Sequence, residues 1–97
     1  MGKEYFIKCP KLDAQATQQF LEQSFIVVAI ENETLALSLW DAAAEPASNW
    51  VPVVVGLESD GVYFLDNSAY PIQAASIFMQ LVDFLLSKAE AITITEL

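Results

Sequence analysis

The spacing of apolar and polar residues predicts short elements from the first residues onward. Residues 3–8 are aromatic and β-branched, which is typical of a strand, and this strand ends before Pro10 because proline lacks a backbone N–H. Residues 14–23 predict a surface helix with Asp13 as its N-cap. Ala16, Phe20 and Leu21 form the narrow apolar stripe that would place this helix on a sheet.

Two strands with different patterns follow. Residues 25–30 are all apolar, which predicts a central strand covered on both faces. Residues 31–33 form a polar turn, and residues 34–40 then alternate. The leucines of this second strand share one face, and the other face carries Thr34, Ala36, Ser38 and Trp40.

The middle of the chain contains a connector and a second hairpin. Residues 41–49 (DAAAEPASN) predict a flexible connector or a single helical turn. Residues 50–57 predict a strand, in which Pro52 favours an edge position and Gly56 a bulge or a close approach. Asp60 and Gly61 predict a type I′ turn with positive φ, after which residues 62–65 return as the next strand.

The clearest periodic signal is a helix over residues 70–88, with Pro71 in its first turn. Its polar residues form one thin stripe and are Gln73, Ser76, Gln80, Asp83, Ser87 and Glu90. The rest of its circumference is apolar, which is more than one sheet can cover. Residues 91–95 predict a last short strand.

Together the elements predict one α+β domain over residues 1–97, in the order β-α-β-β-β-β-α-β. We expect a two-layer sandwich: a mostly antiparallel sheet with two helices on one face. The order resembles a ferredoxin-like βαββαβ plan with an added hairpin. This resemblance is topological, because no sequence motif assigns the chain to a family.

Composition adds an excess of apolar surface and of negative charge. Hydrophobic residues make up 55% of the 97 positions, which favours self-association, most simply as a homodimer. The net charge of −9 repels nucleic acid and anionic lipid, and it favours a basic protein as partner. The simpler alternative is that the charge only keeps an apolar domain soluble.

The single cysteine and the start of the chain bear on location. Cys9 cannot form a disulfide within the chain, so the fold does not depend on an oxidising compartment. The first residues do not resemble a signal peptide, and no run of residues is long and apolar enough to span a membrane. We therefore expect a cytoplasmic protein that is not bound to a membrane.

Groups that carry catalysis are scarce. The chain has no histidine, and its four basic residues are all lysines, so Cys9 lacks the usual base of a cysteine nucleophile. Asp60 and Asp66 are expected to serve a turn and a helix entry. The acidic residues do not match a calcium-binding loop, and the chain lacks a glycine-rich phosphate loop. We expect no cofactor, no metal and no enzymatic activity.

Aromatic residues give the better indication of a site. Trp40 and Trp50 flank the 41–49 connector, and tryptophan is enriched at interface hot spots. Asp41 and Glu45 would supply charge beside these two anchors. The alternative is that both tryptophans cover the rim of the core.

The sequence thus predicts a non-enzymatic, acidic, homo-oligomeric interaction protein that binds a basic partner. In charge and size it is similar to immunity proteins and other small inhibitors. The alternative is a small-ligand module or minor enzyme with a pocket near Trp40, Trp50 and the 41–49 loop, where Asp41, Tyr63 or Asp66 would provide polar contacts. Salt separates the two, because only an electrostatic binder loses affinity steeply with ionic strength.

Overall fold

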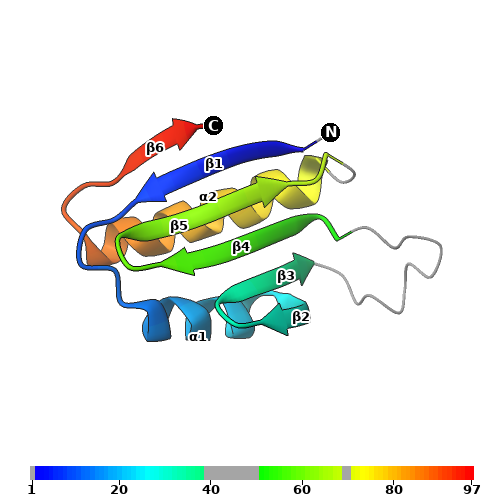
Figure 1. The fold of residues 1–97 in the computed structure, drawn as a ribbon, viewed down its shortest axis with the longest axis horizontal. Coiled ribbons are helices and arrows are strands. Elements are labelled where there is room, and N and C mark those ends of the chain that lie inside the picture. The colour runs from blue at the N-terminus through cyan, green and yellow to red at the C-terminus, as the bar shows by residue number, and fades with distance from the viewer. Residues whose placement is uncertain (1, 39–50, 69–70) are drawn as a thin grey trace.

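A computed structural model describes residues 2–38, 51–68 and 71–97 of the chain. In these ranges the chain forms an antiparallel six-stranded sheet and two helices, so the expected α+β class and element order are confirmed (Figure 1). The elements are β1 (Lys3–Lys8), α1 (Ala14–Ser24), β2 (Ile26–Glu31), β3 (Thr34–Ser38), β4 (Val53–Glu58), β5 (Gly61–Asp66), α2 (Pro71–Lys88) and β6 (Thr93–Glu96).

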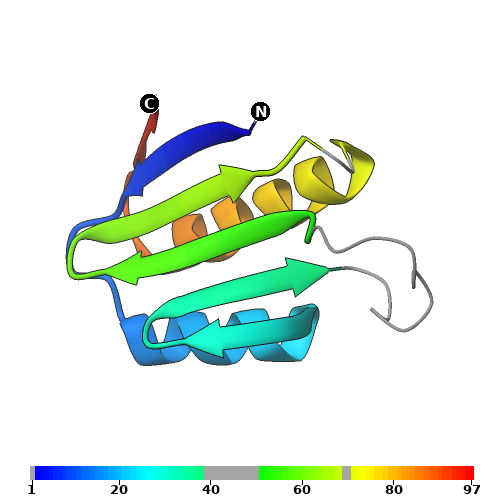
Figure 2. The same cartoon turned by 45° about the vertical axis from the view of Figure 1, so that its right-hand side comes forward.

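The strands are ordered β2-β3-β4-β5-β1-β6, and every neighbouring pair is antiparallel (Figures 1 and 2). β5 and β6 are therefore parallel and enclose β1, with α2 as their connection. Without the β3–β4 pair the order would be β2-β5-β1-β6, in which β1 and β2 likewise enclose one strand. Two such split βαβ units make the ferredoxin-like plan, here with an inserted hairpin, as the element order suggested.

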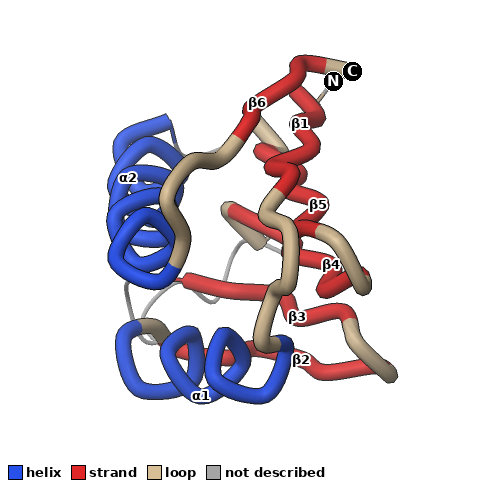
Figure 3. Tube along the Cα trace, turned by 90° about the vertical axis from the view of Figure 1, so that its left-hand side faces the viewer, coloured by secondary structure: helices blue, strands red, loops and turns tan. Residues whose placement is uncertain are grey.

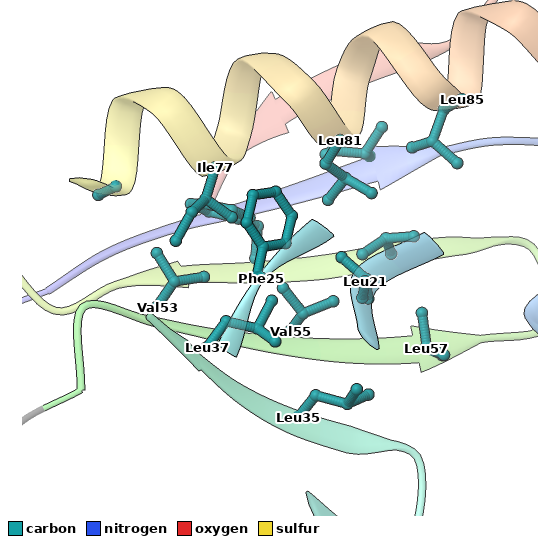
Figure 4. Close-up of a cluster of buried hydrophobic side chains, with 14 of the residues drawn as sticks. Leu21, Phe25, Leu35, Leu37, Val53, Val55, Leu57, Ile77, Leu81 and Leu85 are labelled. Atoms are coloured by element: carbon teal, nitrogen blue, oxygen red, sulfur yellow. The ribbon is translucent and has the colours of Figure 1, made fainter. Parts of the chain in front are cut away.

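Both helices lie on the same face of the sheet, and the other face has no helix among the described residues (Figure 3). α1 lies beside β2, and α2 lies along β5. Between the layers is one apolar core (Figure 4). Its fully buried members include Ile7, Leu21, Leu35, Leu37, Val53, Val55, Val62, Phe64, Ile77, Leu81 and Leu85.

The start of α1 shows how a local sequence signal becomes structure. Asp13 is extended, and its Oδ1 accepts a hydrogen bond of 3.0 Å from the backbone N–H of Ala16. The Thr17 hydroxyl donates to the Asp13 carbonyl over 2.8 Å. These bonds satisfy groups that would otherwise lack partners at a helix start, so the expected N-cap is confirmed.

The position of β2 differs from the expectation. We expected residues 25–30 to form a central strand, but β2 is the edge of the sheet, and Val28 and Ile30 are 40% and 47% exposed. Phe25, the first residue of the apolar run, is buried beyond the strand as the C-cap of α1. An apolar run indicates that a strand needs cover but does not say which strand covers it.

β4 shows the opposite error. We expected an edge strand because of Pro52, but β4 lies between β3 and β5. Pro52 immediately precedes the first paired residue, Val53, so no hydrogen bond of the ladder is lost. Gly56 forms no bulge, since the pairing runs through it without a break. The register shift lies in β2 instead, between Val27 and Ala29.

The β4–β5 hairpin lies where the sequence predicted it, but its turn is not the expected one. The turn residues are 59 and 60, and Gly61 is the first residue of β5 and lacks a positive φ. Glycine is needed there for space, because a Cβ would collide with the carbonyl oxygen of Ile7 and with the ring of Phe6. In the β2–β3 turn Asn32 does adopt a positive φ of 57°, as a tight turn requires.

Candidate functional site

The two faces of α2 have different surroundings although both are apolar. Ile77, Leu81 and Leu85 point into the core and are buried (Figure 4). On the outside, Ile72, Met79 and Leu86 are 80%, 70% and 48% exposed. These three follow one another at intervals of seven residues, which places them on one side of the helix. We call them the α2 outer stripe.

Smaller side chains fill the space along this stripe. Ala75 is exposed and Val82 half-buried, and both lie between the larger residues at helical spacing. A shallow groove runs beside them, lined by Phe78, Met79, Gln80, Val82, Asp83 and Leu86. Monomeric proteins rarely leave a continuous apolar surface of this kind uncovered, so it is the strongest candidate for an interaction site on the described residues.

One member of the expected polar stripe is in a different place. Gln73 is buried at the start of α2, where its Oε1 accepts a hydrogen bond of 3.2 Å from the Ser38 hydroxyl. We expected Ser38 on the face of β3 opposite the leucines, but its side chain contacts Gln73 of α2 instead. The pair connects the end of β3 to the first turn of α2, and it allows two polar side chains to be buried together.

Tyr63 lies on the face of the sheet that carries no described helix, because its neighbours Val62 and Phe64 point into the core. Its direct cross-strand partner is Phe6 of β1. Its hydroxyl donates a hydrogen bond to the Glu4 carboxylate. This bond, then partial burial and the charge of Glu4, raise the pKa of Tyr63 to about 12.

Asp66 lies on the opposite face of β5 from Tyr63, on the side of the helices. Its Oδ1 accepts a hydrogen bond of 2.7 Å from the backbone N–H of Ser68, in the turn that leads toward α2. It also lines a hollow with Pro71 and Ile94. The structure therefore does not bring Tyr63 and Asp66 together as parts of one site.

The other residues that the sequence selected lie outside the described part of the chain. These are Trp40, Asp41, Glu45 and Trp50, together with the rest of the 41–49 connector. The proposed site at this end of the sheet stays a prediction. The described residues that border it are Ser38, at the end of β3, and Val51.

A small hollow of about 210 Å³ lies between the β1–α1 loop and the end of α2, lined in part by Cys9, Lys11, Phe84 and Lys88. Cys9 is buried, and its burial raises the pKa of the thiol. A raised pKa keeps the thiol neutral, so it is a poor nucleophile at neutral pH. Among the described residues no group of three or more histidine, cysteine or acidic side chains could hold a metal ion.

Charge is distributed unevenly along the chain. No basic residue occurs between Lys11 and Lys88, so α1 and strands β2 to β5 contain no lysine or arginine. In the same part of the fold, Glu22, Glu31 and Glu33 are exposed. The β2 side of the molecule therefore presents negative charge without nearby compensation from its own strand or helix.

No family model, no curated protein and no solved structure matches this chain. None of the helices in the described ranges has the length and hydropathy required to cross a lipid bilayer.

Two surfaces were not predicted from the sequence. The apolar excess of α2 was predicted, but its position on the α2 outer stripe was not. The seven-residue interval of Ile72, Met79 and Leu86 was the available signal. The apolar run of β2 was predicted at the sheet centre, and no local pattern in this run distinguishes a central strand from an edge strand that needs a partner.

Proposed function

We propose that this chain is a non-enzymatic, acidic interaction protein of the cytoplasm that forms a homodimer through the α2 outer stripe and binds a basic protein partner. The observation that carries the proposal is the exposure of Ile72, Met79 and Leu86 in one line on a helix whose other face is already buried. Homodimer interfaces resemble a core cut in half, and such a stripe fits that description.

An antiparallel pairing of two α2 helices suits the side chains on this surface. A twofold axis at Met79 would place Ile72 of one copy opposite Leu86 of the other. The same axis would place Asp83 opposite Ala75, so the two carboxylates would not meet. A parallel pairing would set Asp83 against its own copy, which is unfavourable for like charges.

The basic partner is supported by charge. The net charge is −9, and all four basic residues lie outside the segment from α1 to β5. Small inhibitors and immunity proteins use such acidic surfaces against basic targets. Within this proposal Trp40 and Trp50 remain the expected anchors, with Asp41 and Glu45 beside them, because aromatic residues on a connector are typical interface hot spots.

One observation favours the second candidate function, a small-ligand module. The hollow beside Cys9 and Phe84 has a largely apolar lining, to which Lys11 and Lys88 add two cationic side chains. It lies between the β1–α1 loop and the end of α2, whereas we expected a pocket near Trp40 and Trp50, which are outside the described residues. A ligand site there would be insensitive to changes on the α2 outer stripe.

The two parts of the main proposal respond to salt in opposite directions. Dimerisation brings two bodies of charge −9 together, so salt should strengthen it by screening their repulsion. Binding of a basic partner should weaken with salt. Sedimentation equilibrium of the wild type and of Met79→Lys, at low and high salt, tests the first part, with Gln23→Lys, exposed on α1, as the control for added charge.

The second part is tested with basic proteins encoded beside the gene of this chain. Calorimetric titration of each candidate at about 50 mM and about 500 mM salt should show a steep loss of affinity. A partner whose affinity does not change with salt, or the absence of any basic partner among these neighbours, would contradict the electrostatic proposal.

A further inference from the structure

β2 has a sequence suited to burial on both faces but lies at the edge of the sheet. Its residues from Ile26 to Ile30 are all apolar, and Val28 and Ile30 remain 40% and 47% exposed. Among the described residues, β2 pairs only with β3. One row of its backbone N–H and C=O groups therefore faces away from the sheet.

Proteins usually protect such an edge with charges, proline or a strong bulge. β2 contains neither a charge nor a proline between Ile26 and Ile30. Its register shift lies between Val27 and Ala29, which leaves Ala29, Ile30 and Glu31 regularly paired with β3. The end of β2 beside the β2–β3 turn thus offers an ordered template for another strand.

The opposite edge of the same sheet is built differently. β6 has four residues, two of them threonines, and it ends in Glu96. Its neighbour β1 carries Lys3 and Lys8, so both signs of charge occur at this edge. Short, polar strands near mixed charges discourage further pairing. β6 therefore serves as a comparison for β2 within the same molecule.

The surroundings of β2 define the kind of strand that would fit. Glu31 ends β2, Glu33 follows in the turn, and Glu22 is exposed on α1, the helix beside this strand. No lysine or arginine lies in α1, β2 or β3. An added segment with apolar side chains against Val28 and Ile30, and lysine or arginine toward the glutamates, would match both the apolar surface and the charge.

The geometry points to β2 as the docking edge for the basic partner, which would add an extended segment of its own as a seventh strand beside the six present. This inference rests on the proposed function and specifies its site. Main-chain hydrogen bonds would provide affinity, and alternate side chains would provide selectivity. A second copy is a poorer occupant, because it would bring two acidic surfaces together.

The probe is a capped, fluorescent peptide of alternating valine and lysine, about eight residues long, which matches a typical strand. A second peptide of the same sequence is methylated at two consecutive central backbone nitrogens, which blocks pairing on both of its edges. We expect the methylated peptide to bind at least ~10-fold more weakly in fluorescence polarisation, because it keeps the charge of the first peptide but loses the main-chain hydrogen bonds to β2. We also expect the unmodified peptide to slow hydrogen exchange in β2 but not in β6.

Variants of the chain locate the site. Ile30→Lys and Val28→Lys place a charge on the edge at exposed positions and should each reduce peptide affinity about 10-fold or more. Ile94→Lys is the matched control on β6, where the wild-type side chain is 44% exposed. Thermal melting of each variant shows whether it is folded, and Glu33→Gln measures the contribution of charge, which should mainly slow association.

Four results would overturn the inference. Equal binding of both peptides, or equal loss with Ile94→Lys and Ile30→Lys, would mean attraction to a diffuse acidic surface, and the proposed function would still stand. Absence of saturable binding would exclude β2 as a receiving edge for basic strands. Assemblies of the protein alone that Ile30→Lys dissolves would show that a second copy occupies the edge.

Discussion

The inner and outer faces of α2 carry similar side chains in opposite surroundings. Leu81 is completely buried against the sheet, whereas Leu86, five residues further along the same helix, is 48% exposed. The inner face is explained by the core of one chain. The fold of one chain does not explain the exposed apolar residues of the outer face, and under the proposed function a second copy covers them.

The largest expected effect is on the free energy of unfolding, when leucine is replaced by alanine once on each face of α2. Leu81→Ala should lower the free energy of unfolding by about 2–5 kcal/mol, because it leaves a cavity in the core. Leu86→Ala, measured at low protein concentration, should change it by less than ~0.5 kcal/mol. Denaturant titration of both variants gives the two values. Similar losses at the two positions would mean that both faces support the fold of a single chain.

The second effect concerns the concentration dependence of stability. If the α2 outer stripe is a dimer interface, the melting temperature of the wild type should rise with protein concentration, because association stabilises the folded state. Met79→Lys should melt at a temperature that does not depend on concentration. Calorimetric scans over about a hundredfold range test this. A wild-type melting temperature that does not depend on concentration would contradict this role of the stripe. So would a Met79→Lys melting temperature that rises with concentration as much as that of the wild type.

The buried pair at the start of α2 should give a smaller effect. Ser38→Ala removes the hydrogen bond to Gln73 and should cost about 1–2 kcal/mol, because one polar partner is lost in a buried place. Ser76→Ala is the matched control, since its hydroxyl only accepts an exposed bond from Gln80. The control should change stability by no more than about 0.5 kcal/mol. A larger loss of stability for Ser76→Ala than for Ser38→Ala would mean that Gln73 lies on the outer side of α2, as the sequence suggested.

The smallest expected effect is a change in the pH dependence of stability, and it comes from Tyr63 on the face of the sheet away from α2. The pKa of Tyr63 is raised to about 12, chiefly by its hydrogen bond to Glu4. A folded-state pKa above the unfolded value of about 10 gives stability that is complete below pH ~10 and is lost as the pH rises through 12. Tyr63→Phe should remove this part of the alkaline loss. An ultraviolet titration should also show Glu4→Gln lowering the pKa, and no change there would contradict the bond.

Local signals were sufficient for most of the fold. Asp13 acts at short range, as does Pro71, the first residue of α2, and β1 has the bounds that its residues predicted. The errors concern neighbours in space. β2 was placed at the centre and β4 at the edge, because strand order depends on which hairpins pair across the sheet. Gln73 fits a polar stripe by its spacing, but its burial depends on Ser38, 35 residues earlier in the chain.

The candidate site was predicted less well than the fold. The apolar excess of α2 was visible in the sequence, but its division between core and surface required the sheet against which the helix packs. Tyr63 and Asp66 are close in sequence but lie on opposite faces of β5, since successive side chains of a strand alternate. The tryptophan site adjoins β3 and stays a prediction from composition.

Covalent trapping at the centre of the stripe tests the dimer most directly. A twofold axis at Met79 brings this position of both copies together, so Met79→Cys in a Cys9→Ser background should form a disulfide-linked dimer of about twice the 10.7 kDa chain mass under mild oxidation. Gln23→Cys in the same background, exposed on α1, should remain largely monomeric. Equal trapping at the two positions, or none at position 79, would contradict association through α2.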